Sequence, residues 1–136
     1  MTAEIKLRIP DRRPYHGVAR LVVGGLAARL DLSYEHLEDL QLALASVLEM
    51  DGYARDAEVV VELEVGQDTL TMLVGPLNGE QVRADLADER SEGIGLRRVL
   101  STVVETVDVE EREDGEWLRL EKRVLLLASR ESDDGA

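Results

Sequence analysis

The sequence predicts an α/β (α+β) two-layer sandwich, with three main helices on one face of a mixed, largely antiparallel sheet. Two observations support this fold class. Apolar residues alternate over 3–9, over 58–65 and through 70–74, which is typical of half-buried strands, whereas over 15–30 and 34–50 they recur at helical spacing. The predicted order is strand-helix-helix-strand-strand-helix-strand-strand, which favours helices packed against one face of a sheet.

Capping and turn residues mark the ends of the first two helices. Pro14 suits the first turn of the first helix, and Ser33 is a good N-cap for the second. Gly24 and Gly25 lie inside the first helix, where each costs roughly 1 kcal/mol relative to alanine. We expect the close approach of another backbone to compensate for this cost. The face that this helix turns to the core is expected to consist of Val18, Leu21, Val22, Gly25, Leu26 and Leu30.

From residue 75 onwards the sequence predicts a polar loop, a helix and a β-hairpin. Residues 75–92 are polar and contain glycine and proline, so we expect a loop there that includes at most a short helix. A helix that ends near Thr106 follows. Residues 107–112 and 116–126 are predicted to form a hairpin around Asp114-Gly115, a two-residue turn signal.

Length and composition limit the classes of protein. The 136 residues fit one domain, residues 1–128, followed by a polar C-terminal tail at 129–136. The net charge of −13 argues against nucleic acid or an anionic membrane as the main partner and permits a basic protein. No cysteine is present, so thiolate metal sites are excluded. No signal peptide or membrane-spanning run is visible, and we expect a cytoplasmic protein.

The sharpest motif is the segment 91–100, Ser-Glu-Gly-Ile-Gly-Leu-Arg-Arg-Val-Leu. Gly93 and Gly95 open the predicted helix, and a glycine-rich start leaves N–H groups free at the positive end of the helix, where a phosphate can bind. The alternative is a tight turn with close packing, and the residues alone leave both interpretations open. Arg97 and Arg98 either contact a phosphate or lie solvated on the outer face of the helix.

Nearly the whole chain resembles the histidine-kinase-like ATPase (GHKL, Bergerat) fold, in particular the bacterial anti-sigma factors that double as serine-protein kinases. The matching segments are 8–30, 39–50 and 92–107. In the last of them, Gly93, Gly95 and Leu96 match the family's Gly-x-Gly-Leu. The resemblance implies ATP or ADP with magnesium as ligand, a sigma factor and an anti-anti-sigma protein as partners, and a homodimer.

The residues at the family's functional positions depart from its pattern. Aligning Leu42-Ala43-Leu44 with the family places Ser46 at the general base and Met50 at the magnesium ligand. A hydroxyl is a poor base near neutral pH, and a thioether is a poor ligand for a hard cation. A shifted alignment would offer Glu49 as the base instead. We therefore expect neither a resident metal ion nor a resident cofactor, and magnesium with ATP or ADP only if the site is functional.

The adenine-binding position also lacks its usual acidic residue. Gly75, Asn78 and Gly79 occupy the place of the family's Asp-x-Gly-x-Gly, and Pro76 stiffens this segment. Without a carboxylate, the adenine amino group has no acceptor there. We therefore expect a degenerate member of the family in which only the glycines of the phosphate lid remain.

Three functions are consistent with the sequence. The first is an anti-sigma-factor-like regulator that binds its protein partners with a degraded ATP site. The second is an active serine-protein kinase that uses Glu49, and the third is a dimerisation or scaffold module with Gly24 and Gly25 in the contact. His16 and His36 have no metal-binding partners and are expected at the surface or half-buried. Trp117 is expected either to pack in the fold or to anchor a partner.

Overall fold

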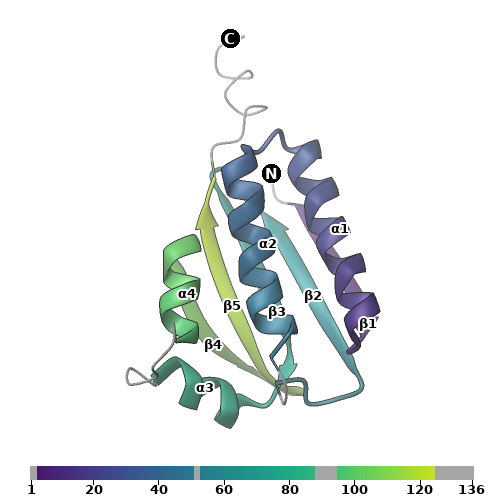
Figure 1. The fold of residues 1–136 in the computed structure, drawn as a ribbon, viewed down its shortest axis with the longest axis vertical. Helices are drawn as coiled ribbons and strands as arrows, with labels where there is room; N and C mark the ends of the chain where they lie inside the picture. The colour runs from purple at the N-terminus through teal and green to yellow at the C-terminus, as the bar shows by residue number, and fades with distance from the viewer. Residues whose placement is uncertain (1–2, 51–52, 88–94, 125–136) are drawn as a thin grey trace.

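The computed structural model describes residues 3–50, 53–87 and 95–124, whose strands form one five-stranded antiparallel sheet with the order β1-β2-β3-β5-β4. The elements are β1 (Ala3–Pro10), α1 (Arg13–Arg29), α2 (Tyr34–Leu48), β2 (Glu58–Val65), β3 (Thr69–Leu77), α3 (Gly79–Ala87), α4 (Leu96–Val103), β4 (Thr106–Arg112) and β5 (Gly115–Arg123). The helices lie on one face of the sheet, with α2 between α1 and α4 (Figure 1). The predicted fold class is therefore confirmed, although every strand pair is antiparallel and α3 adds a fourth helix in the described part of the chain.

The first half of the chain forms the elements that its sequence predicts. β1 ends at Pro10, and α1 carries Pro14 in its first turn, where the missing N–H leaves no helical bond unmade. Ser33 caps α2, since its Oγ accepts a hydrogen bond from the backbone N–H of His36 at 3.1 Å. β2 spans the predicted residues 58–65.

The loop predicted over 75–92 begins too early, because β3 continues to Leu77. The short helix that was allowed within it is present as α3 at Gly79–Ala87. Gly75 lies inside β3, and the indole of Trp117 packs so closely on it that a Cβ atom would overlap the ring. The glycine therefore makes room for the Trp117 ring within the sheet and does not mark a loop. Residues 88–92 of the predicted loop lie outside the described residues.

The last helix and the hairpin differ from the prediction at their boundaries. α4 ends at Val103, because the backbone becomes extended at the next residue and β4 begins at Thr106. The hairpin turn consists of Glu113 and Asp114, one residue earlier than predicted, and Gly115 is the first residue of β5. Gly115 has φ +139°, a conformation that favours glycine. The predicted tail at 129–136 lies outside the described residues.

An apolar core fills the space between the sheet and the helix layer. The sequence contains no phenylalanine, so leucine and valine supply most of this core. β2 alternates because only one of its faces meets the helices. Fully buried members of the core include Leu40, Leu44, Val47, Tyr53, Val59, Leu63, Leu70, Met72, Leu100, Leu118 and Leu120. None of the helices in the described ranges is long and apolar enough to cross a membrane.

Within the described residues no helix covers the opposite face of the sheet, which we call the helix-free face (Figure 1). This face carries an aromatic ring beneath paired charges. The guanidinium of Arg112 lies 4.1 Å from the centre of the Trp117 ring and donates to the Glu62 carboxylate at 3.0 and 3.3 Å. The hydrogen bonds to Glu62 and Glu110 hold the pKa of Arg112 above its ordinary value, although partial burial opposes the shift. Trp117 is buried under this pair, so of the two roles expected for it the structure supports packing.

The sequence predicted the buried face of α1 only in part. Val22, Leu26 and Leu30 are partly buried against the core, as expected, whereas Val18, Leu21 and Gly25 are exposed. The fully buried residues of α1 are His16, Ala19, Val23 and Ala27. Both stripes of α1 are apolar, and the stripe of small alanines is the one that lets the helix approach the sheet closely. The expectation for His16 is therefore wrong as well, because it is buried with Nε2 2.9 Å from Asp11 Oδ1.

The two adjacent glycines of α1 do not contact another backbone in the described part of the chain. A Cβ atom at Gly24 would lie 3.5 Å from Nε2 of Gln41 on α2, which is ordinary contact with a side chain. At Gly25 such an atom would meet nothing within 4 Å. The expected compensation by backbone approach is therefore wrong, and Gly25 faces open space.

Candidate functional site

The three segments that resemble nucleotide-site elements meet at one end of the helix layer. The end of α2, the end of β3 and the beginnings of α3 and α4 lie together at the lower end of Figure 1. Buried side chains from all four elements join the same core, including Leu48, Leu77, Val82 and Leu96. Tertiary structure thus brings together residues that are almost 50 positions apart in the sequence.

The residues at the predicted catalytic positions lie at the C-terminal end of α2. Ser46 is half-buried, and its Oγ donates to the backbone oxygen of Leu42 at 2.7 Å. α2 ends at Leu48, so Met50 lies beyond the helix and is exposed, which corrects the prediction that the helix extends to residue 50. Glu49 is the C-cap residue and is exposed, with Oε1 3.8 Å from a guanidinium nitrogen of Arg20.

The predicted adenine segment forms the junction between β3 and α3. The backbone N–H of Asn78 donates to the carbonyl of Tyr53 at 2.7 Å, and its own carbonyl accepts from Val82 at 3.1 Å. A Cβ atom at Gly79 would overlap the Glu116 carboxylate. Both bonds of Asn78 are backbone bonds that fix the start of α3.

The start of α4 contains the described part of the glycine motif. Gly95 is the N-cap, with φ −64° and no side-chain cap, and Leu96 is buried in the core. Arg97 Nε donates to the carbonyl of Leu86 at 3.2 Å, which joins α4 to the last turn of α3. Gly93 lies outside the described residues.

One residue that the sequence did not single out occupies the centre of this region. Tyr53 is 1% exposed, and its hydroxyl donates to Asp85 Oδ2 at 2.5 Å. Burial raises the pKa of Tyr53 above its ordinary value, and the hydrogen bond to Asp85 raises it further. The chain has only one tryptophan, three tyrosines and no phenylalanine, and this scarcity could have marked each aromatic as a candidate core residue.

A pocket of about 440 Å³ opens beside the N-terminus of α3. Its lining carries charges of both signs, and its three exposed polar residues are Arg55, Asn78 and Glu80. The lining residues are Ala54, Arg55, Leu77, Asn78, Gly79, Glu80 and Glu116. Two of the predicted adenine-site residues, Asn78 and Gly79, therefore border a pocket.

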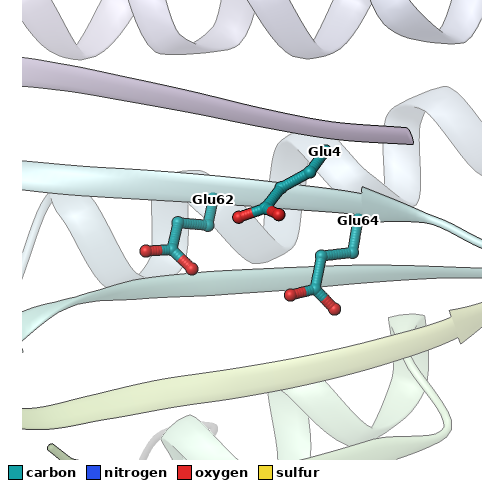
Figure 2. Close-up of side chains that lie close together, drawn as sticks. All are labelled: Glu4, Glu62 and Glu64. Carbon is teal, nitrogen blue, oxygen red and sulfur yellow. The ribbon is translucent and has the colours of Figure 1, made fainter. Parts of the chain in front are cut away.

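Three carboxylates gather on the helix-free face of the sheet (Figure 2). Glu4 on β1 and Glu62 and Glu64 on β2 each place an oxygen within 4.8 Å of the others. Both oxygens of Glu62 already accept hydrogen bonds from Arg112, and Glu4 lies 3.5 Å from the ammonium of Lys6. Neighbouring cations thus balance part of this negative charge, and the cluster by itself does not define a metal site.

The exposed side of α1 is a further candidate surface, which we call the α1 outer face and define by Gly17, Val18, Leu21 and Gly25. Leu21 is 75% exposed, and a Cβ atom at either glycine would meet nothing within 4 Å. α1 has no acidic residue, in contrast with the chain's net charge of −13. Its three arginines are Arg13, Arg20 and Arg29. The α1 outer face is therefore an exposed apolar surface on a basic helix of an acidic domain.

A one-sided antiparallel sheet whose helix layer brings these segments together is consistent with the resemblance to the histidine-kinase-like ATPase class. No family model matches the chain. The chain is 30% identical over 128 residues to the serine-protein kinase RsbW of Bacillus pumilus (strain SAFR-032), which covers 78% of this chain and 77% of the relative. It is 27% identical over 124 residues to the serine-protein kinase RsbW of Bacillus subtilis (strain 168), with coverages of 78% and 77%.

A solved structure agrees on the fold. The crystal structure of the RsbU and RsbW domains of Rv1364c from Mycobacterium tuberculosis matches with a TM-score of 0.63 and 15% identity, over 90% of this chain. The match covers 32% of that longer chain, and at this identity it supports the fold alone. Together with the sequence relatives, these findings show that the chain belongs to the RsbW family of anti-sigma serine-protein kinases.

Proposed function

We propose that this chain is an anti-sigma-type regulatory protein that binds a sigma factor, an anti-anti-sigma protein or both, without efficient phosphoryl transfer. Membership of the RsbW family supports the kind of partner. The observation that carries the loss of transfer is the hydrogen bond from Ser46 Oγ to the Leu42 carbonyl at 2.7 Å. At the position where the family resemblance implies a general base, a hydroxyl donates to the backbone of its own helix.

Magnesium with ATP does not fit the residues at this end of the helix layer. Magnesium prefers oxygen ligands, and Met50 offers a thioether beyond the end of α2. The ring of Tyr53 and the side chains of Val82 and Leu86 belong to the apolar core where the nucleotide segments meet. These side chains therefore make an apolar core beside the segments that would hold a nucleotide, and they offer no ligand to a magnesium ion.

The α1 outer face supports the binding half of the proposal. Leu21 supplies an exposed apolar contact, and Gly17 and Gly25, one turn away on either side, leave room for a partner to approach closely. The arginines of α1 favour acidic groups on a partner, whereas the negative charge elsewhere favours basic ones. Attraction between opposite charges on the two partners speeds their association, and added salt weakens this attraction.

The binding test uses calorimetry of the purified chain with the sigma factors and anti-anti-sigma proteins of its source organism. We expect at least one to bind, with affinity that falls as salt rises, and Leu21→Asp to weaken that binding at least tenfold. Tyr34→Asp is the matched control, since Tyr34 is 73% exposed but lies at the start of α2. Failure of every candidate to bind at low salt would overturn the proposal.

The nucleotide test uses ATP and ADP, each with magnesium. We expect no heat of binding and no thermal shift at millimolar nucleotide, whereas a ligand at a hundredfold excess over its Kd would stabilise the protein by about 2.7 kcal/mol. Phosphate transfer from ATP to a serine of an anti-anti-sigma protein, abolished by Glu49→Ala, would favour an active kinase instead. The carboxylate of Glu49 is exposed at the end of α2, so this variant removes a candidate base without disturbing the core.

A further inference from the structure

α3 is a short helix that depends on the rest of the domain for its stability. It has nine residues, Gly79–Ala87, and isolated helices shorter than about 12–15 residues are marginal in water. Only Val82 and Leu86 of its long apolar side chains enter the core. The contacts that hold α3 against the domain therefore decide whether it stays folded and docked.

The ion pairs of α3 with the sheet are weak attachments. Arg83 lies 3.1 Å from a Glu116 oxygen and 3.4 Å from a Glu111 oxygen, and both the guanidinium and the Glu111 side chain are exposed. Exposed ion pairs of this kind contribute little, because water and salt screen them. The hydrogen bond from Arg97 to the Leu86 carbonyl is also made by an exposed side chain.

The bond between Tyr53 and Asp85 differs from these attachments because its donor is buried. The tyrosine hydroxyl donates to Asp85 Oδ2 at 2.5 Å, and Oδ1 of the same carboxylate accepts from Gln81 at 3.3 Å. Hydrogen bonds to charged groups are the stronger kind, and a hydroxyl left buried without an acceptor is costly. The backbone carbonyl of Tyr53 also accepts from Asn78, so this residue contacts both ends of the helix.

We propose that the Tyr53–Asp85 hydrogen bond is a latch that holds α3 docked against α4 and β5, and that α3 opens as a local unit when this bond is broken. The ring of Tyr53 fills the space under the helix, and its hydroxyl fixes the helix above it. The latch goes beyond the proposed function, and it is tested on the free chain without a partner or nucleotide. Its failure would therefore leave the binding proposal untouched.

The test is native-state hydrogen exchange of the full chain, resolved by segment. Tyr53→Phe keeps the ring and removes the hydroxyl, and Asp85→Ala removes the acceptor at a position where alanine suits a helix. We expect either variant to speed exchange of the α3 amides about 10- to 100-fold, the range that follows from losing a charge-assisted hydrogen bond. Exchange in the centres of α2 and β3 is expected to stay within twofold of the wild type.

The double variant and a control complete the test. If the two groups act through one bond, Tyr53→Phe with Asp85→Ala speeds α3 exchange no more than the larger single effect. Tyr34→Phe removes a hydroxyl from an exposed tyrosine and should leave α3 unchanged. Unchanged α3 exchange in Tyr53→Phe, additive effects in the double variant, or equal acceleration in all segments would each overturn the latch.

Discussion

The buried ammonium of Lys122 predicts an asymmetry between two substitutions of one ion pair. Lys122 is 5% exposed, and its Nζ lies 3.0 Å from Asp39 Oδ2 and 2.6 Å from the carbonyl of Val103. It therefore links β5 to α2 and to the last turn of α4, where a positive charge also suits the helix dipole. The side chain of Asp39 is 27% exposed, so water can reach one partner of the pair much better than the other.

The magnitudes follow from what each substitution leaves behind. Asp39→Ala leaves a buried ammonium with a single carbonyl acceptor, and breaking a buried pair in this way costs about 3–5 kcal/mol. Because the carbonyl of Val103 still accepts, we expect the lower end, about 3 kcal/mol. Lys122→Met keeps an apolar stem of similar length and leaves Asp39 to water, so we expect a cost of about 1 kcal/mol.

Urea unfolding of the two variants and the wild type measures this asymmetry. Equal slopes of free energy against urea would show that the unfolded states are comparable. We expect Asp39→Ala to lower the free energy of unfolding by about 2 kcal/mol more than Lys122→Met. A larger cost for Lys122→Met than for Asp39→Ala would refute the reasoning. The loss of its ion-pair partner would then destabilise the protein more at the partly exposed Asp39 than at the buried Lys122.

Three other predictions concern the pH dependence of stability and substitutions at two glycines. Because folding raises the pKa of Tyr53 above its ordinary value of 10, its stabilising contribution is complete below pH 10 and is lost as pH rises through the higher folded value. The stability difference between wild type and Tyr53→Phe should fall by about 1.4 kcal/mol per pH unit above pH 10 in urea unfolding, and a constant difference would contradict this. Gly25→Ala should raise the free energy of unfolding by about 0.5–1 kcal/mol, since the site is open and helical. Gly75→Ala should lower it by about 1–3 kcal/mol through collision with Trp117, and thermal melts of the two variants check both signs.

Most elements were predictable because local chemistry marks them. Strict alternation defined β2 at 58–65 to the residue, and the hydroxyl of Ser33 marked the start of α2. α3 was expected only as an optional short helix within a loop, because a nine-residue helix that begins with glycine has weak local preference and is held by its contacts. Gly75 and Pro76 were interpreted as the start of a loop, although both belong to β3. The strand has a glycine at position 75 because the Trp117 side chain of β5 packs against it.

The candidate site was predictable in its residues and not in its geometry. The motif positions Ser46 and Met50 followed from the alignment. The hydrogen bond from Ser46 Oγ to the Leu42 carbonyl could be identified only in the three-dimensional structure. Tyr53 was missed because the polar residues around it resemble a loop, and the partner of its hydroxyl lies 32 positions away. The α1 outer face was missed because the exposed and buried stripes of that helix are both apolar.

Periodicity, caps and motif spacing are properties of short segments, so the sequence alone predicted the fold class, the order of the strands and the three main helices, and the family. Tertiary structure alone decided which stripe of α1 faces the core, which side chain fills the end of the helix layer, and which charges are paired across strands. These outcomes depend on contacts such as Tyr53 with Asp85 and Glu62 with Arg112, which join residues far apart in the chain. A residue's own type limits what it can bind, but burial and the partner that it meets decide what it does bind.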